Sequence, residues 1–561
     1  MTNKHDDDTL DTGRRRLLGG MATTGALLAL GGLQEAVADG KTPVAIPAPG
    51  GKEMDALLDK HVQNVVVIYA ENRSFNNLFG DFPGLQQPLS AVPADRLIQR
   101  DRDGKAFDNL PPIWGGMVPH EQVVDHKTYK IGEKDMPALP NAPWALHTGD
   151  GTPLPHGLIT RDLVHAFYNN QLQINGGKND GFVAWGDSGA LTMGYYAKTP
   201  VHLRIWRLAE QFTLCDNFFM GAFGGSFLNH QYLVAAQPPF YPGADKSPAQ
   251  FNIAVTQSGD PKDFRLTMAE DSPPSAMQGK PKFAHHSSLT PDFWAVGTMG
   301  PPYSPGFNVD RKNPLLTDST SANTMPAQTH KHIGDVLSAK GIDWAWYAGG
   351  FQAALDGKGD GTDNSFPQKP NFQAHHQPLN YFVSLAPGTD ARKQHLRDGG
   401  LGETPATNRF LADIDAGKLP PVTFYKPQGD LNMHAGYSDV EAGDRHIATI
   451  IDHLRKSKQW KDMVVIVTFD ENGGWWDHVA PPKGDRWGPG TRIPALVVSP
   501  YAKKGHVEHT IYDTGSIARF ITRRFKLEKL PGLAMREQAM VAAGGPAPGD
   551  MTETLDFSRA G

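Results

Sequence analysis

Two segments, NVVVIYAEN at residues 64–72 and MVVIVTFDEN at residues 463–472, decide the fold of this chain. Each holds a continuous apolar run, residues 65–70 and 463–469, which is typical of a strand buried on both faces. Four further runs predict strands of the same kind: residues 212–215, 344–347, 422–425 and 493–499. Apolar residues with helical spacing lie between the runs: around residues 333–337, 440–457 and 517–521. This alternation predicts an α/β fold with a mostly parallel sheet covered by helices on both faces.

The composition is that of a large globular protein. Of 561 residues, 39% are hydrophobic and 9% aromatic, which is too much for a disordered chain. The 60 Gly and 45 Pro residues follow no period, which excludes collagen-like and coiled-coil proteins and indicates long, shaped loops. Lys and Arg (54) nearly balance Asp and Glu (60), so we expect no nucleic acid partner. Cys215 is the sole cysteine and excludes an intrachain disulfide.

The N-terminal residues 1–38 have the three parts of an export signal. A charged GRRRLL segment at 13–18 precedes a short apolar stretch at 19–33, and Ala-Val-Ala follows at 36–38. Consecutive arginines before a weak apolar stretch predict a twin-arginine signal, with the twin-arginine export machinery as partner. The mature protein, residues 39–561, would then be periplasmic or secreted, without a membrane span. The alternative is a loose N-terminal tail that contains arginines.

Two long segments, residues 84–160 and 238–330, interrupt the alternation of strands and helices. Both are rich in Pro, Gly, Asp and Ser and show no apolar period. Loops of this length are unusual in a compact domain unless they cover a site. We expect insertions that form a smaller cap over the strand ends. For the central part, residues 255–300, a surface excursion explains the composition nearly as well.

Carboxylates follow directly after the two longest predicted strands. Glu71 and Asn72 follow the first strand, and Asp470 and Glu471 follow the second. In open α/β sheets, ligands bind beyond the carboxyl ends of the strands. Crowded carboxylates repel one another, and a hard divalent cation bound by oxygen ligands removes that repulsion. Either pair alone would be explained as solvated loop acids, but both together favour a metal site.

A glycine-rich segment, GAFGGS at residues 221–226, precedes a predicted helix. Glycines before a helix let the backbone approach an anion, and free N–H groups favour phosphate there. Ser226 is then either the cap of the helix or a nucleophile, which would need activation by a base or a metal. From this pattern alone, capping is the preferred interpretation.

Histidines supply groups that can bind anionic oxygens and protonate a leaving group near neutral pH. Four of them lie near predicted strand ends or in loops: His165, His375, His376 and His434. Any single one is explained as well by a structural hydrogen bond. Asp477 and His478 could ligate a second metal ion, but support of their loop is the preferred interpretation. The pair at 285–286 has no assigned role.

These motifs resemble the bacterial phosphoesterase family of acid phosphatases and phosphatidylcholine-type phospholipases C, within the alkaline phosphatase superfamily. They occur in the family's order over about residues 60–525. They are NVVVIYAENRSF at 64–75, GGSFLNHQYL at 224–233, HHQPLNYF at 375–382, HAGYS at 434–438, FDENGGWWDHVAPP at 469–482 and GTRIPALVVSP at 490–500.

The resemblance implies a three-layer α/β/α sandwich of the alkaline phosphatase type, with a smaller cap made by loop insertions. It implies one bound divalent metal ion, of unknown identity, whose ligands are Glu71, Asn72, Asp470 and Glu471. It makes Ser226 the nucleophile and a neighbour of the metal. Around the phosphate it places His165, His375, His376 and His434.

Two features resemble the acid phosphatase branch. Ser226 stands where phospholipase C members usually carry Thr in a G-P-T-x-P-N-R context, and only about forty residues follow Phe520, too few for their C-terminal β-domains. We therefore expect an exported, metal-dependent acid phosphatase that hydrolyses phosphomonoesters through a serine nucleophile. The first alternative is a phospholipase C that acts on phosphatidylcholine-type phosphodiesters. The second is a non-catalytic exported binding protein, against which the intact Ser226, Glu71, Asp470 and Glu471 argue.

Overall fold

An eight-stranded sheet forms the centre of the computed structural model, which describes residues 51–357 and 372–558. The strand order is β13-β6-β12-β11-β1-β10-β8-β9. The strands are β1 (Asn64–Ala70), β6 (Thr213–Cys215), β8 (Trp344–Gly349), β9 (Leu396–Gly400), β10 (Val422–Lys426), β11 (Met463–Phe469), β12 (Ala495–Val498) and β13 (His506–Glu508). All neighbours are parallel except β12, which is antiparallel to both β11 and β6. The predicted export signal, residues 1–38, lies outside the described residues.

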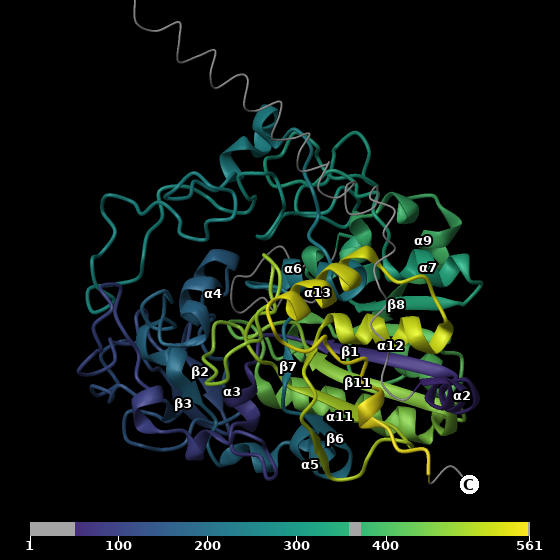
Figure 1. Cartoon of the computed structure of the whole chain (residues 1–561), viewed down its shortest axis with the longest axis horizontal. Helices are drawn as coiled ribbons and strands as arrows, with labels where there is room; N and C mark the ends of the chain where they lie inside the picture. Colours follow the sequence, from purple (N-terminus) through teal and green to yellow (C-terminus); the bar gives the residue numbers. More distant parts are fainter. Residues whose placement is uncertain (1–50, 358–371, 559–561) are drawn as a thin grey trace, which may run out of the picture.

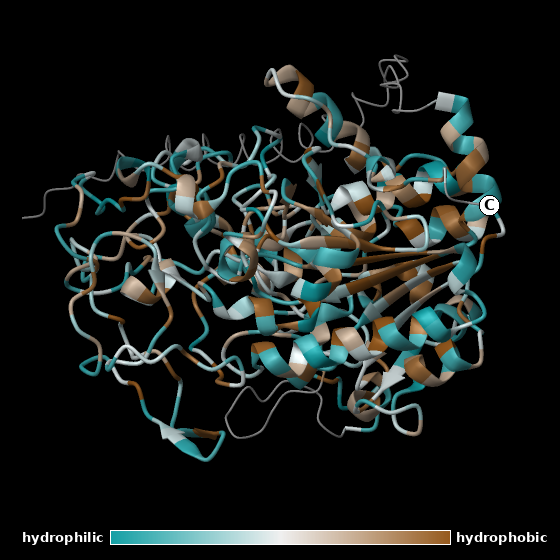
Figure 2. Ribbon diagram, turned by 90° about the horizontal axis from the view of Figure 1, so that it is seen from below, coloured by the Kyte–Doolittle hydropathy of each residue, from teal (hydrophilic) through white to brown (hydrophobic). Residues whose placement is uncertain are grey.

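Helices cover both faces of the sheet (Figure 1). One layer contains α5 (Arg204–Gln211), α10 (Arg409–Asp415) and α11 (Val440–Lys456). The other contains α2 (Gly51–His61), α6 (Ser226–Ala235), α7 (Ile333–Ala339) and α12 (Gly515–Phe525), with α13 (Pro531–Ala542) beside it. Figure 2 shows the hydrophobic strands between these two layers of amphipathic helices. The predicted three-layer α/β/α architecture is confirmed.

The apolar pattern explains these elements. Every residue of β1 and β11 is buried, as a strand with both faces covered requires. In α11, the apolar residues at 447, 450, 451 and 454 form one fully buried face. Asp439 caps this helix, because its carboxylate accepts the Ala442 N–H over 2.7 Å. All six predicted strands and three predicted helices are present, with strand boundaries shifted by at most two residues. The antiparallel direction of β12 was not predicted.

The two long segments contain little regular structure. Residues 84–160 hold the hairpin of β2 (Gln122–Val124) and β3 (Lys127–Tyr129), and β4 (Trp144–Ala145), which pairs with β5 (Gly194–Tyr195). Residues 238–330 hold two 3₁₀ turns and isolated bridges. In Figure 1 these loops lie beside one end of the sheet, to the left and at the top.

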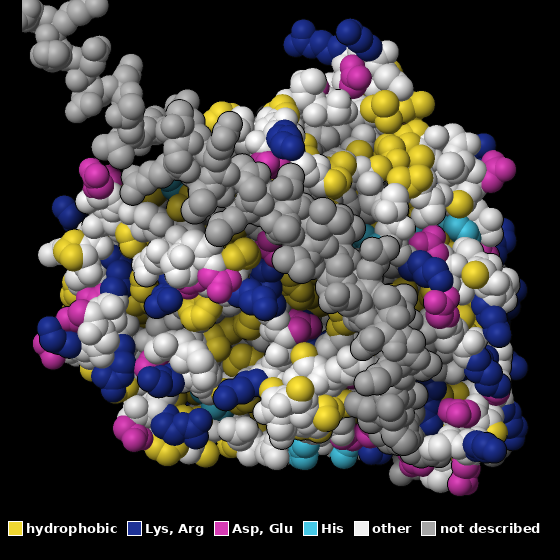
Figure 3. Space-filling model, turned by 45° about the horizontal axis from the view of Figure 1, so that its top comes forward, with side chains coloured by type: hydrophobic (Ala, Val, Ile, Leu, Met, Phe, Trp, Pro, Cys, Tyr) yellow, Lys and Arg dark blue, Asp and Glu magenta, His cyan; other side chains and the backbone are white. Residues whose placement is uncertain are grey.

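Smaller elements complete the described chain. The short helices are α3 (Phe75–Phe79), α4 (Phe167–Ile174), α8 (Phe351–Leu355) and α9 (Asp390–His395), and a two-stranded sheet joins β7 (Phe218–Phe219) to β14 (Tyr512–Asp513). On the face shown in Figure 3, basic and acidic side chains are interspersed, in line with their near balance in the sequence. None of the helices within the described ranges combines the length and the apolar character needed to cross a bilayer.

Candidate active site

The strand register places the predicted metal ligands side by side. Ala70 pairs with Phe469 where the parallel strands β1 and β11 end, so the following residues leave the sheet at the same edge. The backbone N–H of Asn72 donates to Asp470 Oδ1 over 3.0 Å. All four predicted ligands are fully buried: Glu71, Asn72, Asp470 and Glu471.

His434 fixes the orientation of the Asn72 amide. Nδ1 of His434 lies 2.5 Å from the Ala435 carbonyl oxygen, to which it donates the ring proton. Burial lowers the pKa of His434 well below its usual value, so the ring is neutral and its Nε2 accepts from Asn72 Nδ2 over 3.1 Å. The Asn72 amide oxygen then faces Glu471 Oε1 at 3.0 Å and Glu71 Oε2 at 3.1 Å. The opposite orientation of the amide would need a proton on both nitrogens of His434.

This set of oxygens fits a divalent cation. Oxygens at such short distances repel one another, and hard cations prefer carboxylate and amide oxygens as ligands. Asp470 Oδ2 is buried and has no hydrogen-bond partner among the described residues. Burial, with a contribution from Asp470, raises the pKa of Glu471 well above its usual value. A bound cation would offset that cost of burying the ionised carboxylate.

The side chain of Ser226 does not cap α6. The helix begins at Ser226 itself, its N-cap residue is Gly225, and no side chain caps it. The hydroxyl of Ser226 instead donates to Glu71 Oε2 over 3.1 Å. Capping is therefore the wrong explanation for this serine, because a capping serine would stand one residue before the helix. The hydroxyl is directed toward the proposed metal ligands.

The loop before Ser226 is held in place by close contacts. Gly224 has a φ of +94°, and a Cβ at this position would lie 2.5 Å from the backbone nitrogen of Phe167. The side chain of Asn229 bonds to both backbone groups of Ala222: it accepts the N–H over 2.9 Å and donates to the carbonyl over 3.1 Å. These contacts fix the point at which the chain enters α6.

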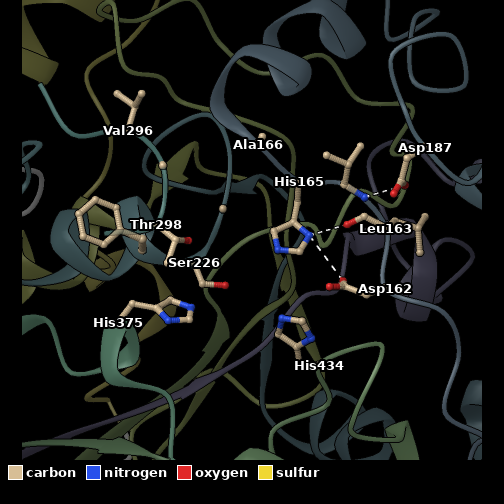
Figure 4. Close-up of a pocket in the computed structure, with 14 residues that line it drawn as sticks. Asp162, Leu163, His165, Ala166, Asp187, Ser226, Val296, Thr298, His375 and His434 are labelled. Atoms are coloured by element: carbon tan, nitrogen blue, oxygen red, sulfur yellow. Dashed lines mark hydrogen bonds and ion pairs between the residues drawn. The ribbon is translucent and has the colours of Figure 1, made fainter. Parts of the chain in front are cut away.

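Ser226 lines a cavity of about 330 Å³. Figure 4 shows its hydroxyl and the rings of His165, His375 and His434 directed toward a common space. A second cavity of about 490 Å³ shares five residues with the first: Asp162, His165, Thr298, His375 and His434. Three of the four predicted histidines thus surround the space in front of the serine.

His165 differs from the other histidines because carboxylates face both of its ring nitrogens. Its Nδ1 lies 2.6 Å from the Leu163 carbonyl oxygen and 3.7 Å from Asp162 Oδ1. Its Nε2 lies 3.6 Å from Glu471 Oε1. Burial disfavours the charged ring, but Glu471 and Asp162 outweigh this effect and raise the pKa of His165 to about 9. His165 can therefore carry a proton into the cavity.

The two adjacent histidines have different surroundings. His375 lines both cavities, and burial lowers its pKa to about 3. His376, which the resemblance places around the phosphate, lines neither cavity and points toward Glu71, with 3.5 Å between Nδ1 and Oε1. Its ring stacks on that of His230, with 4.9 Å between centroids and 4° between planes.

Three residues that the sequence analysis did not single out belong to this centre. His230 and Lys426 both contact Glu71, and Asp162 lines the two cavities. His230 lies four residues after Ser226 in α6, and this spacing on one helix face was the signal for it. Lys426 is the last residue of β10. Charged residues are common at strand ends, so nothing in the sequence marks Lys426 as part of the site.

Two close groups of His and carboxylate side chains in the described ranges could hold a metal ion. They are Glu71-His230-His376 and Asp162-His165-His434. The carboxylates of Glu71, Asp470 and Glu471 do not form such a group by themselves among the described residues; the amide oxygen of Asn72 lies between Glu71 and Glu471.

Asp477 and His478 support their loop. Asp477 forms an ion pair with the buried Arg492, with 3.1 Å between Nε and Oδ1. His478 contacts Asn76 Oδ1 at 2.9 Å and the Gln87 carbonyl oxygen at 3.0 Å. Both side chains are thus engaged in structural contacts, as the preferred interpretation of the sequence expects.

Residues of both long segments reach the cavities. Val296, Gly297 and Thr298 line the first cavity, and Phe307 and Pro119 line the second. These segments therefore form part of the wall opposite the strand ends.

A model of the Phosphoesterase family matches residues 62–528 of the chain. Phospholipase C B of Mycobacterium tuberculosis is 25% identical over 581 residues, which cover 96% of this chain and 83% of that protein. Non-hemolytic phospholipase C of Pseudomonas aeruginosa is 23% identical over 531 residues, which cover 89% of this chain and 58% of that protein. Among solved structures, a protein in the alkaline phosphatase superfamily from Vibrio parahaemolyticus aligns with a TM-score of 0.23 and 13% identity, over 38% of this chain and 51% of its own.

Proposed function

Because the chain belongs to the Phosphoesterase family and is a phosphoric ester hydrolase, we propose that it is a metal-dependent phosphomonoesterase whose nucleophile is Ser226. One observation carries this proposal. The Ser226 hydroxyl is free of helix capping, donates to Glu71 and lines the cavity that His165 also lines. A nucleophile on the cavity wall, a buried carboxylate beside it and a protonated acid nearby are the groups that ester hydrolysis needs.

The reaction would proceed in two displacements. Ser226 Oγ forms a bond to phosphorus while the bond from phosphorus to the leaving oxygen breaks, and the leaving oxygen takes a proton. Water then attacks the phosphoserine, which releases inorganic phosphate and returns a proton to Ser226. A divalent ion held by Glu71, Asn72, Asp470 and Glu471 would lower the pKa of the serine hydroxyl and offset phosphate charge.

Histidines would protonate the leaving oxygen and bind the charged phosphate oxygens. His165 is the candidate acid because its pKa is about 9 and the ring lines the cavity. Burial keeps the ring of His375 neutral, so it would bind a phosphate oxygen through its N–H group without adding charge. Such a fixed donor stabilises charge that develops in a transition state.

A phospholipase C activity is the second candidate. It is favoured by the names of two relatives, from Mycobacterium tuberculosis and Pseudomonas aeruginosa, that match most of this chain. The serine in place of the threonine found in a G-P-T-x-P-N-R context supports the phosphomonoesterase. Hydrolysis of p-nitrophenyl phosphate and phosphatidylcholine from pH 4 to 8, before and after chelation, separates the two.

Ser226→Ala and Thr298→Val form a matched pair for this assay, because both remove a hydroxyl group from the cavity wall. We expect Ser226→Ala to lose most turnover of either ester, and Thr298→Val to retain it. Hydrolysis of phosphatidylcholine without hydrolysis of p-nitrophenyl phosphate would favour the phospholipase C. Near-normal turnover by Ser226→Ala would reject both serine mechanisms.

Export and a cap complete the proposal. The arginines and the Ala-Val-Ala site within residues 1–38 support export through the twin-arginine route, so mass spectrometry of the exported protein should find an N-terminus at or near Asp39. An intact Met1 chain in the periplasm would contradict this. Lining of the cavities by Thr298, Phe307 and Pro119 supports a cap made by the two long segments.

A further inference from the structure

Three nitrogen-bearing side chains converge on one oxygen of Glu71, on the side away from the cavity. Lys426 Nζ forms an ion pair with Glu71 Oε1. His376 Nδ1 lies 3.5 Å and His230 Nε2 lies 3.7 Å from the same oxygen. All four side chains are buried. The other oxygen of Glu71, Oε2, accepts the hydroxyl of Ser226. The two sides of this carboxylate therefore have different partners.

His230 presents an unpartnered ring nitrogen to this cluster. Its Nδ1 lies 2.8 Å from the Ser226 carbonyl oxygen, to which it donates its proton. Its Nε2 faces Glu71 Oε1 and is buried without a hydrogen-bond partner in the described part of the chain. A buried ring nitrogen beside a carboxylate oxygen is a position that a metal ion can occupy.

The side chains around that position form a metal-binding set. One atom each from Glu71, His230 and His376 lie within 4.8 Å of one another. Two imidazoles and one carboxylate are a common zinc-binding set. His376 Nε2 is also buried without a hydrogen-bond partner among the described residues. The geometry would suit a second ion beside the one proposed at Glu71, Asn72, Asp470 and Glu471.

Lys426 already supplies a cation there. Its ammonium group reaches Glu71 Oε1 from the end of β10, the strand next to β1 in the sheet, and donates to the Tyr69 carbonyl oxygen over 3.2 Å. The side chain is 3% exposed, and its nitrogen occupies the position beside Glu71 Oε1. A divalent ion at the same carboxylate oxygen would have to displace the Lys426 side chain from this position.

We propose that Lys426 takes the place of a second metal ion at Glu71, His230 and His376 and limits this centre to one ion. The inference rests on the proposed metal centre at the strand ends, but it does not depend on which phosphate ester is the substrate. It assigns Lys426, His230 and His376 to control of metal number rather than to contact with phosphate.

Metal counting tests the proposal. Wild-type protein and the variant Lys426→Met are freed of metal, incubated with excess zinc and passed through a desalting column before elemental analysis. We expect about one zinc per chain in the wild type and two in Lys426→Met. Lys426→Arg, which keeps the charge, should stay at one. The double variant Lys426→Met/His230→Phe, which removes a ligand of the second ion, should return to one. A folded Lys426→Met protein that still binds one zinc would overturn the proposal.

A measurement on the wild type covers the case in which Lys426→Met does not fold. Wild-type crystals soaked in excess zinc should show one anomalous-scattering peak, beside Asp470 and Glu471. A peak between His230 and His376, with Lys426 displaced, would overturn the inference and leave the proposed hydrolase intact. A fully active wild-type enzyme without any bound metal would instead contradict the proposed metal centre and, with it, this inference.

Discussion

Replacement of Gly224 by alanine tests how strictly the loop must present Ser226. Gly224 has a φ of +94°, where an L side chain is strained, and its added Cβ would lie 2.5 Å from the nitrogen and 2.6 Å from the Cα of Phe167. Carbon atoms in van der Waals contact lie about 3.5–4.0 Å apart, so the loop must move by roughly 1 Å. Because Gly224 is two residues before Ser226, this shift would carry the hydroxyl away from Glu71.

The expected size of the effect has two parts. The strained backbone costs about 1–3 kcal/mol, and the steric overlap costs roughly the same again if the loop does not move. If the loop moves, stability recovers, but a displacement of about 1 Å at a reacting group costs about 10²-fold in rate. We therefore expect kcat/KM for p-nitrophenyl phosphate to fall about 100-fold in Gly224→Ala.

Gly341→Ala is the matched control. Gly341 also has a positive φ, +72°, but a Cβ there would meet nothing within 4 Å. This variant should lose about 1–3 kcal/mol of unfolding free energy in urea, from backbone strain alone, and keep its kcat/KM. If Gly224→Ala and Gly341→Ala had the same kcat/KM, the loop would not set the position of the nucleophile.

Three further predictions concern the metal, the acid and pH. Chelation should abolish turnover and a divalent ion should restore it, whereas activity in a protein shown to be metal-free would contradict the metal centre. His165→Asn should slow alkyl phosphates about 10²–10⁴-fold more than aryl phosphates, because a phenolate leaves without a proton; equal losses would mean that His165 only binds phosphate. Burial lowers the pKa of His446 from 6.5 to about 3. Below pH 6.5 the unfolded chain therefore binds a proton that the folded chain does not bind, and the free energy of unfolding falls as pH falls. At pH 5 this effect amounts to about 2 kcal/mol, and urea unfolding of His446→Gln should show a shallower loss between pH 7 and pH 5 than the wild type; equal losses would mean that His446 is not the group responsible.

The sequence was most informative where one physical requirement sets the pattern. Strands β1 and β11 could be predicted because a strand covered on both faces must be apolar throughout, and their register then brings Glu71 beside Asp470. The direction of β12 could not be predicted, since a buried strand has the same pattern in parallel and antiparallel pairs.

The surroundings of single side chains could be predicted less well from the sequence. Capping was preferred for Ser226 because a serine directly before a helix usually caps it. The helix α6, however, begins at Ser226 itself, so the capping position is occupied by Gly225. Lys426 ends an apolar run, and nothing in its neighbours along the chain shows that it lies 3% exposed against Glu71. Such long-range ion pairs depend on the sheet order, which the sequence pattern does not contain.

Trapping of the phosphoenzyme tests the central claim most directly. Wild-type protein mixed with a phosphomonoester and quenched rapidly in acid should yield a peptide phosphorylated at Ser226, detected by mass spectrometry. Ser226→Ala should remain folded, give no phosphopeptide and lose most turnover. A Ser226→Ala protein with near-normal kcat, or phosphorylation of the wild type at a different residue, would contradict the account.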